Sequence, residues 1–193
     1  IPYKHGFSAS TTTITALEMK FSGGCDDDKN DYESSSAGGG NDDCSGTLFC
    51  DYFDGPALDG DKWNIVNDSG ITVSGGWLSL PNASSIATKD NFDSYCQDKQ
   101  VDIHSAPYFG SVFLGKMGLS AGKDTGVLAC GDEDAIVDIS GAELSLYKSG
   151  GLLSLLVGGK ITSIPCAEDI SYVQLTAGLN DKVEIDYVKV KCR

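Results

Sequence analysis

The sequence predicts an all-β protein, a two-sheet antiparallel sandwich with an extra strand segment at its N-terminus. Three observations carry this prediction. Short alternating or apolar runs recur between Gly, Asn, Asp and Pro breaks from Thr47 onward. No window longer than about ten residues combines helical periodicity with capping residues. The chain also contains 24 glycines, which suit tight hairpins such as Ser149-Gly-Gly and Gly158-Gly159.

A length of 193 residues accommodates one sandwich of ordinary size and a short appendage. We divide the chain into an N-terminal strand extension over residues 1–22, an acidic Gly/Ser-rich loop over 23–46, and the sandwich over 47–193. Within the sandwich, short apolar or alternating runs predict strands at Leu48–Phe53, Ile71–Val73, Trp77–Leu80, Ser85–Thr88, Gln100–Ile103, Tyr108–Met117, Gly126–Cys130, Ala135–Ile139, Glu143–Tyr147, Leu152–Val157, Tyr172–Thr176 and Val183–Val190.

The N-terminal extension contains one clear strand pattern. Leu17, Met19 and Phe21 alternate with Glu18 and Lys20, so the apolar side chains share one face of an extended segment. Such a strand either adds an edge to its own domain or completes an open sheet edge of a neighbouring subunit. In the second case these three apolar residues are the assembly contacts.

The loop over residues 23–46 contains too few apolar residues to bury a face, and we expect a solvated segment closed between Cys25 and Cys44. Its carboxylates raise the alternative of a calcium site at Asp26 and Asp28. The spacing there begins like a calcium-binding loop but lacks the glycine and the distal glutamate that such loops use. A second acidic pair, formed by Asp132 and Asp134, offers the same two alternatives.

Cysteine usage indicates a secreted protein. Seven cysteines are many for a cytosolic β domain, and all are disulfide candidates: Cys25, Cys44, Cys50, Cys96, Cys130, Cys166 and Cys192. Because the number is odd, one thiol is left as a buried free cysteine, an intermolecular bridge or a bond to a partner outside this chain. The start at Ile1 suggests a processed chain, and the sequons at Asn67 and Asn82 are candidate glycosylation sites.

The charge balance limits the classes of partner. Fourteen basic and 28 acidic residues give a net charge of −14, which repels nucleic-acid phosphates and anionic lipid surfaces. The longest apolar run, Leu152–Val157, has the length of a strand and cannot span a bilayer. We therefore expect neither nucleic-acid binding nor membrane insertion. The cysteines lack CxxC spacing and the two histidines are far apart in sequence, so we expect no zinc site, and no cofactor other than calcium is considered.

Three stretches of sequence, Phe53–Trp63, Gly75–Leu80 and Val183–Val190, resemble the opening and closing strands of the concanavalin-like lectin and glucanase superfamily. This superfamily includes laminin-G-type modules, many lectins and laminarinase-type glycosidases. The resemblance implies a jelly roll in which an early strand pairs with the last one. It also implies that Trp63 and Trp77 are core or near-core anchors.

On the same resemblance, the last strand places Val183, Ile185, Tyr187 and Lys189 on one face, opposite the alternating residues Glu184, Asp186, Val188 and Val190.

The glycosidases of this superfamily carry a Glu-x-Asp-x-Glu type of motif whose carboxylates flank the scissile bond. The chain offers a partial match at Glu184-Ile-Asp186, but the next residue on that face is Val188. We therefore expect no glycosidase activity. The lectins of the superfamily instead stack a sugar on an exposed aromatic side chain, for which we consider Tyr95, Tyr108, Phe109 and Tyr147.

These observations favour a secreted, non-enzymatic structural or adhesive subunit that associates with itself or with other extracellular proteins. In the mechanistic version, residues 8–21 of one subunit add a strand to the next and build a filament. The alternative is a carbohydrate-binding, lectin-like module. An enzyme that acts on β-glucans ranks third.

Overall fold

The computed structural model describes residues 44–105, 110–122, 124–139, 143–179 and 181–193, and all of the regular structure in these ranges is β-strand. No helix long and apolar enough to span a membrane occurs in these ranges. The predicted N-terminal strand with Leu17, Met19 and Phe21 lies outside them. The predicted boundaries at residues 22 and 46 therefore remain predictions, although the first strand of the described ranges begins at Thr47.

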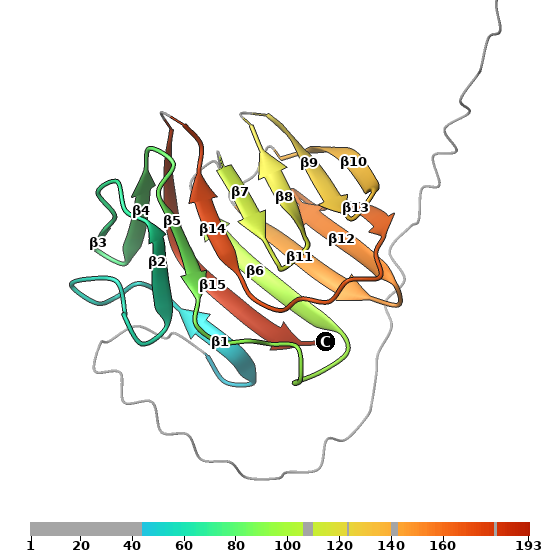
Figure 1. Ribbon diagram of the computed structural model, residues 1–193, viewed down its shortest axis with the longest axis horizontal. Helices are drawn as coiled ribbons and strands as arrows, with labels where there is room; N and C mark the ends of the chain where they lie inside the picture. Colours follow the sequence, from blue (N-terminus) through green and yellow to red (C-terminus); the bar gives the residue numbers. More distant parts are fainter. Residues whose placement is uncertain (1–43, 106–109, 123, 140–142, 180) are drawn as a thin grey trace, which may run out of the picture. The chain divides into compact units, whose positions relative to one another are not determined.

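Two antiparallel sheets form a sandwich, as the sequence predicts (Figure 1). Sheet A has eight strands in the order β13-β12-β11-β6-β15-β4-β3, with β1 also paired to β15, and sheet B has seven in the order β10-β9-β8-β7-β14-β5-β2. The bounds are β1 (Thr47–Asp51), β2 (Trp63–Asn67), β3 (Thr72–Ser74), β4 (Trp77–Pro81), β5 (Ser85–Thr88), β6 (Lys99–Ser105), β7 (Gly110–Phe113), β8 (Met117–Ala121), β9 (Thr125–Cys130), β10 (Glu133–Asp138), β11 (Glu143–Ser149), β12 (Leu152–Val157), β13 (Lys160–Pro165), β14 (Gln174–Ala177) and β15 (Lys182–Cys192).

The strands of the structure differ from the predicted strands at three places. The run Tyr108–Met117 was expected to form one strand, but β7 and β8 divide at a turn where Gly115 has a φ of 91°. Strand β2 was not predicted, because all its residues after Trp63 are exposed and give no apolar alternation. Strand β13 was not predicted either, and its burial pattern has a single buried residue, Ile164.

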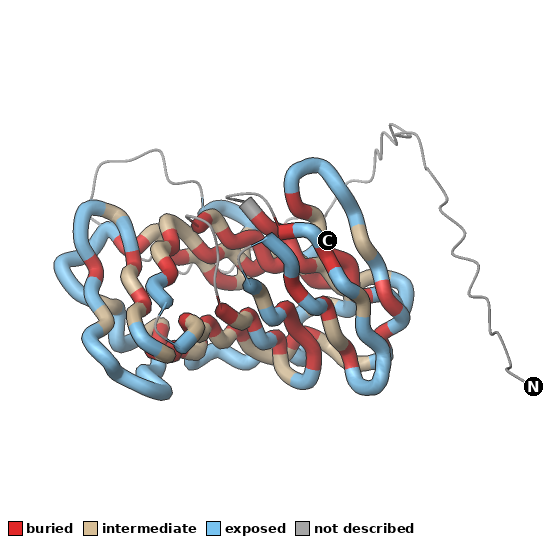
Figure 2. Tube along the Cα trace, turned by 90° about the horizontal axis from the view of Figure 1, so that it is seen from above, coloured by how far each residue is buried: buried red, intermediate tan, exposed pale blue. Residues whose placement is uncertain are grey.

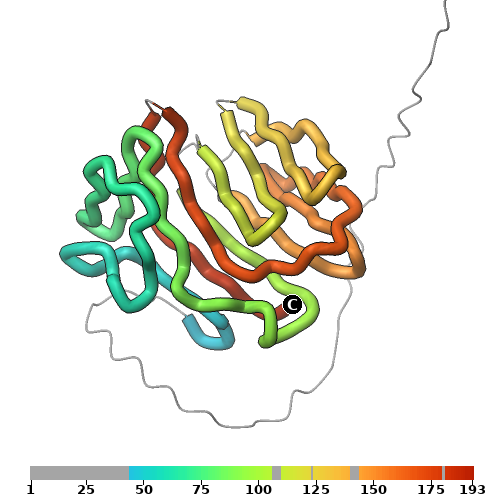
Figure 3. Tube along the Cα trace, in the orientation of Figure 1, coloured from blue at the N-terminus to red at the C-terminus, as the bar shows by residue number. Residues whose placement is uncertain are grey.

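The last strand, β15, organises sheet A. One side of β15 pairs with β6, and the other pairs first with β4 and then with β1. The implied pairing of the first and last strands is thus confirmed (Figure 3).

The predicted facing of β15 is wrong beyond Ile185, because the register with β6 shifts between Ile185 and Tyr187. An extra residue in one strand of a pair reverses the side to which the following residues point. Val188 and Val190 are therefore fully buried, and Tyr187 and Lys189 lie on the outer face.

Paired glycines form three of the hairpins. The two-residue loops Gly75–Gly76, Gly150–Gly151 and Gly158–Gly159 have φ values between 55° and 80°. Positive φ at both central residues is the type I′ geometry whose twist matches that of paired strands, and glycine adopts it without steric cost. The sequence therefore fixes these turns locally, as predicted for the last two.

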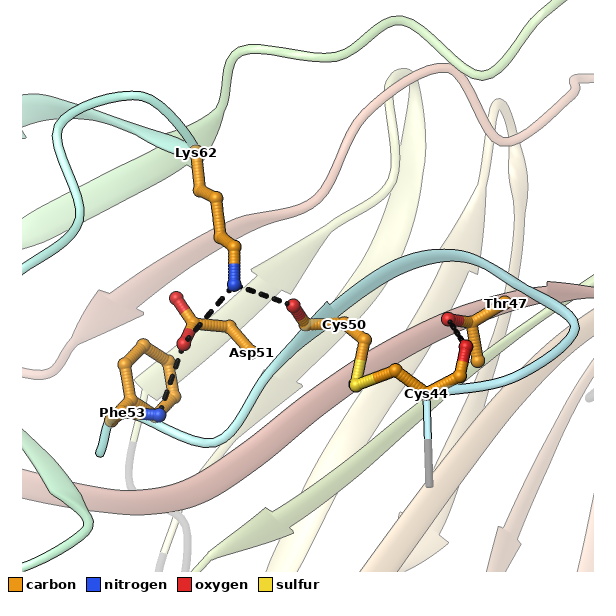
Figure 4. Close-up of a disulfide and its surroundings, with 6 residues drawn as sticks. All are labelled: Cys44, Thr47, Cys50, Asp51, Phe53 and Lys62. Carbon is orange, nitrogen blue, oxygen red and sulfur yellow. Dashed lines mark hydrogen bonds and ion pairs between the residues drawn. A yellow bond between two sulfur atoms is a disulfide. The ribbon is translucent and has the colours of Figure 1, made fainter. Parts of the chain in front are cut away.

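The core lies between the sheets, and buried positions run along the middle strands while exposed ones gather in the loops (Figure 2). Trp63 is 2% exposed, which confirms its expected place in the core. Its indole Nε1 donates a hydrogen bond of 2.6 Å to Oδ2 of Asp51, a carboxylate that is itself 7% exposed. The other oxygen of Asp51 accepts from the backbone N–H of Phe53 at 3.0 Å (Figure 4). A buried indole N–H and a buried carboxylate thus satisfy each other.

Three disulfides occur in the described part of the chain, and they connect Cys44 to Cys50, Cys96 to Cys192 and Cys130 to Cys166. The first corrects the expected Cys25–Cys44 closure, because Cys44 instead closes a loop back onto β1 (Figure 4). The seventh cysteine, Cys25, lies outside the described residues. The bridge from Cys130, at the end of β9, to Cys166, just after β13, ties sheet B to sheet A.

Candidate functional site

The outer face of sheet A carries a cluster of aromatic and charged side chains at the point where β15 meets β4, β6 and β1. We define this aromatic cluster as Tyr52, Trp77, His104, Asp186, Tyr187 and Lys189. The bulge in β15 creates it, because the shift in register directs both Tyr187 and Lys189 outward beside His104 of β6.

Four rings of the cluster lie next to one another. The ring centroids of Tyr52 and Tyr187 are 5.6 Å apart, and those of Tyr187 and His104 are 5.5 Å apart with an interplanar angle of 19°. The row ends at Trp77, whose ring lies 6.2 Å from His104. Such distances lie in the range of favourable ring pairs. Because each ring packs on its neighbour, the row holds its geometry before any ligand arrives.

Trp77 is the exposed end of the row. The resemblance to the superfamily implied a core or near-core anchor, but this tryptophan is 37% exposed. Strand β4 explains the difference, since Leu78 and Leu80 point inward and are fully buried, which leaves Trp77 on the outer side. A large exposed indole next to polar groups is a feature of recognition surfaces.

Two charged groups complete the aromatic cluster. Nδ1 of His104 lies 2.9 Å from Oδ2 of Asp186, and both side chains are about one third exposed at 35%. On the other side, the Lys189 Nζ lies 4.8 Å and 4.9 Å from the ring centroids of Tyr52 and Tyr187. The cluster therefore presents an acceptor, an imidazole and an ammonium group around a row of rings.

A separate polar network lies further along the same face and is centred on Asp102 of β6. Burial alone raises the pKa of this carboxyl group, but hydrogen bonds from Gln100, Ser145 and Lys191 outweigh burial and hold the pKa below its ordinary value. The donors lie 2.6, 2.5 and 2.9 Å from the carboxylate oxygens. These contacts join side chains of β11, β6 and β15, which are neighbours in sheet A.

The outer face of sheet B has a different character. Its five central strands, β5, β14, β7, β8 and β9, contain no Asp or Glu. Their outward positions are mostly Ser, Thr, Ala and Gly, with Phe113 and Val127 exposed at 40% and 39%. The acidic residues of this sheet lie on the edge strand β10. The central strands therefore offer no pair of carboxylates for glycoside hydrolysis.

The two carboxylates of the partial glycosidase match on β15 contact different partners. Oε1 of Glu184 lies 2.6 Å from the Lys182 ammonium, and Asp186 is bonded to His104. Acid catalysis by a carboxyl group requires a raised pKa. Two carboxyl groups elsewhere, Asp102 and Asp68, have a lowered pKa and so are not suited to this role; the backbone N–H groups of Gly70 and Ile71 lower that of Asp68.

The remaining sugar-stacking candidates are not brought together. Tyr95 is 61% exposed but belongs to the loop before β6, away from the aromatic cluster in sequence. Tyr147 of β11 lies under Arg193, whose guanidinium carbon is 4.1 Å from the ring centroid. Tyr108 and Phe109 lie outside the described residues.

Of the four carboxylates predicted to bind calcium, the structure describes only Asp132 and Asp134. In the described ranges no three His, Cys, Asp or Glu side chains form a group that could hold a metal ion. Asp132 lies in the turn after β9 and Asp134 on β10, whereas Asp26 and Asp28 lie outside those ranges. The calcium assignments remain predictions.

The two sequons lie close together at one end of the sandwich. The amide nitrogen of Asn67 donates to the carbonyl oxygen of Ala83 at 2.9 Å, and Ala83 is the middle residue of the second sequon. Asn82 is exposed in a turn with a φ of 48°. Glycosylation of either asparagine remains a prediction.

A small, partly open pocket of about 70 Å³ lies between β10 and the strands β12 and β13. Pockets for small-molecule ligands usually measure about 300–1,000 Å³. A sugar ring therefore does not fit this pocket.

Solved structures with a similar fold include both enzymes and binding proteins. A native glycosidic hydrolase is 14% identical with a TM-score of 0.51, and the match covers 75% of this chain and 95% of that one. The receptor-binding domain of botulinum neurotoxin type G is 12% identical with a TM-score of 0.50, over 77% of this chain and 48% of that one. A legume lectin-like domain from Entamoeba histolytica is 10% identical with a TM-score of 0.43, over 68% and 90%.

The chain has the concanavalin-like β-sandwich fold. The sequence itself matches no protein-family model and no curated protein. At the low identities of the structural matches, the likeness extends to the fold alone, and this fold hosts unrelated functions. The function has to be argued from the surfaces of this chain.

Proposed function

We propose that this domain is a secreted, non-catalytic carbohydrate-binding module whose sugar-binding surface is the aromatic cluster of sheet A. The observation that carries the proposal is the exposed indole of Trp77 beside the His104–Asp186 pair. A pyranose ring presents an apolar C–H face that covers an exposed indole, and its hydroxyl groups seek acceptors and donors at the edge of that indole. Asp186 and His104 supply both.

The arrangement is suited to binding rather than catalysis. The rings and the two charged groups are positioned by strands, and ring packing fixes Tyr187 and His104 before the ligand arrives. A preorganised surface reduces the entropy that a ligand has to offset on binding. The absence of carboxylates from the central strands of sheet B supports the non-catalytic part of the proposal. Three disulfides support secretion.

Calorimetric titration against a panel of neutral and acidic glycans tests this function. We expect saturable binding to at least one glycan, and a loss of about tenfold or more in affinity for Trp77→Ala, which corresponds to about 1.4 kcal/mol. Tyr95→Ala is the matched control, because it removes an exposed aromatic ring that lies outside the aromatic cluster. Binding that persists unchanged in Trp77→Ala would contradict the assignment of the site.

A second proposal keeps the domain as a structural or adhesive subunit that assembles through residues 8–21. One observation favours it: both sheets end in edge strands with exposed isoleucines, Ile136 of β10 at 80% and Ile161 of β13 at 62%. Edge strands are sites for strand addition, and these two isoleucines are apolar contacts for an added strand. Sedimentation analysis of a variant without residues 1–21 separates the proposals, since assembly of that variant would exclude the strand-addition mechanism.

A further inference from the structure

The end of β15 carries three cations on one side. Lys189, Lys191 and Arg193 alternate along the outer face of sheet A, and the backbone N–H of Arg193 still bonds to the carbonyl oxygen of Asp98 at 3.0 Å beyond the last assigned strand residue. Residues four apart in a strand lie about 13 Å from one another. The row therefore begins within the aromatic cluster and extends about 13 Å away from it.

Two of these cations have aromatic partners instead of carboxylates. The Lys189 ammonium lies over Tyr52 and Tyr187, and the Arg193 guanidinium lies over Tyr147. Neither forms an ion pair with a described residue. By contrast, six other lysines have a carboxylate oxygen within ion-pair distance, namely Lys62, Lys99, Lys116, Lys160, Lys182 and Lys191. Lys89 and Lys148 also form no ion pair with a described residue, but neither belongs to this row.

This difference matters because the chain is acidic. With 28 acidic and 14 basic residues, carboxylates are plentiful, yet Lys189 and Arg193 keep their charge available. A cation over a ring is held in place by an attraction worth about 0.5–1 kcal/mol at exposed sites, and this attraction leaves its positive charge unneutralised. The tyrosines therefore position both cations without consuming their capacity to bind an anion.

We propose that the glycan bound at the aromatic cluster is acidic and extends along β15. Its sugar ring covers Trp77, an anionic substituent contacts the Lys189 ammonium, and a second anionic substituent further along the polymer contacts Arg193. Lys191 contributes less, because its ammonium is bonded to Asp102 at 2.9 Å. This inference rests on the proposed carbohydrate binding and specifies its ligand class.

The shared chemistry of the ligand is an anionic group on a sugar, which is either a sulfate ester or a uronate carboxylate. Nucleic acid also carries repeated anions, and its bases stack on exposed aromatic rings. The net charge of −14 weakens the binding of any polyanion, whether polysaccharide or nucleic acid. The two sources of anionic sugar and the nucleic acid become separate arms of the test.

The test measures the affinity of the full chain by calorimetry for four polymers: a sulfated polysaccharide, its desulfated form, a polyuronate and a neutral β-glucan. We expect at least one acidic polymer to bind about tenfold more tightly than its neutral counterpart, and this preference to shrink as the Debye length falls from about 30 Å to about 8 Å. Lys189→Gln should remove most of the preference, Arg193→Gln part of it, and Lys189→Arg should retain it.

Lys89→Gln is the matched control, because Lys89 is exposed, forms no ion pair with a described residue and lies just after β5 in sheet B. Loss of the preference in this variant as well would reduce it to nonspecific charge and overturn the inference. Equal binding of single-stranded DNA would overturn it too. If Lys189→Gln does not fold, the salt dependence of the unaltered chain tests the inference. A preference for the acidic polymer that does not shrink with added salt would then overturn it.

The outcomes separate the two claims. Binding of the neutral polymer that equals or exceeds binding of the acidic ones overturns the acidic ligand and leaves carbohydrate binding in place. Binding of no polymer in the panel removes both the acidic ligand and the proposed function.

Discussion

The two outer faces of this sandwich differ in the side chains that they carry and in how closely their strands approach one another. The face of sheet A bears long aromatic and charged side chains, which the bulge in β15 brings together around Tyr187. The face of sheet B bears small residues, and glycines allow close backbone approach there: a Cβ on Gly110 would meet the carbonyl oxygen of Thr176, and one on Gly118 that of Val112. One face is rich in functional groups, and the other is shaped by backbone packing.

The contrast indicates that the side chains of sheet A can be exchanged with little loss of stability, whereas the small residues of sheet B cannot. A ring on an outer face contributes little to the core, because the inward positions of the same strands already fill it. A collision between a new Cβ and a backbone carbonyl, in contrast, has no flexible atom that can move aside. Variants on the two faces should therefore affect different measurements.

The largest effect is expected for Gly118→Ala on sheet B. The new methyl group would force β7 and β8 apart, and we expect a loss of about 3 kcal/mol in the free energy of unfolding, measured by chemical denaturation. Gly60→Ala is the control, since a Cβ there meets nothing within 4 Å, and its effect should stay within about 0.5 kcal/mol. A stable Gly118→Ala variant would break the contrast between the faces.

A comparison of Trp77→Ala with Phe113→Ala tests the functional half of the contrast. Both side chains are exposed to a similar extent, 37% and 40%, but they lie on opposite faces. We expect the first variant to lose about tenfold or more in glycan affinity, or about 1.4 kcal/mol, and the second to retain the affinity of the unaltered chain. The reverse result in the same titration would move the sugar-binding site to sheet B.

Asp102→Asn sharpens the contrast within sheet A. The folded-state pKa of this carboxyl group is lower than its unfolded value, so its contribution to stability is complete above the unfolded pKa and disappears as the pH falls through the folded one. We expect the variant to lose about 1 kcal/mol at neutral pH and to match the unaltered chain at a pH below the folded-state pKa, where the carboxyl group is protonated.

Chemical denaturation at several pH values, with glycan titration at neutral pH, measures both properties of this variant. Retained glycan binding would divide the face of sheet A into a structural network and a binding cluster. An equal loss of stability at neutral pH and at a pH below the folded-state pKa would show that the ionised carboxylate is not the stabilising group.

Much of the fold could be predicted from the sequence, because inward positions and turns leave local signals. Gly150–Gly151 and Gly158–Gly159 fix two hairpins, and the alternation in Val183–Ile185 identifies the inward side of the last strand. Strand β2 gave no such signal, since its residues after Trp63 are exposed. The pairing of Cys44 with Cys50 could not be derived either, because seven cysteines allow many pairings.

The candidate site was harder to predict than the fold, although one of its residues left a signal in the sequence. This residue is Trp77, because Leu78 and Leu80 occupy the inward positions of β4 and exclude it from the core. Tyr187 and Lys189 left none, since a bulge reverses the facing of a strand without any change in its composition. The stacking of His104 on Tyr187 depends on the pairing of two strands that are far apart in sequence.

A glycan that covers Trp77 should change the surroundings of its indole and leave those of Trp63 unchanged. The chain contains two tryptophans, so a two-dimensional NMR spectrum of the ¹⁵N-labelled protein shows two indole N–H signals. The Trp63 indole is buried and bonded to Asp51, which makes it an internal control. On addition of a glycan that binds, we expect the Trp77 signal to shift and the Trp63 signal to stay in place. A saturating glycan that leaves the Trp77 signal unmoved would show that the glycan does not cover Trp77.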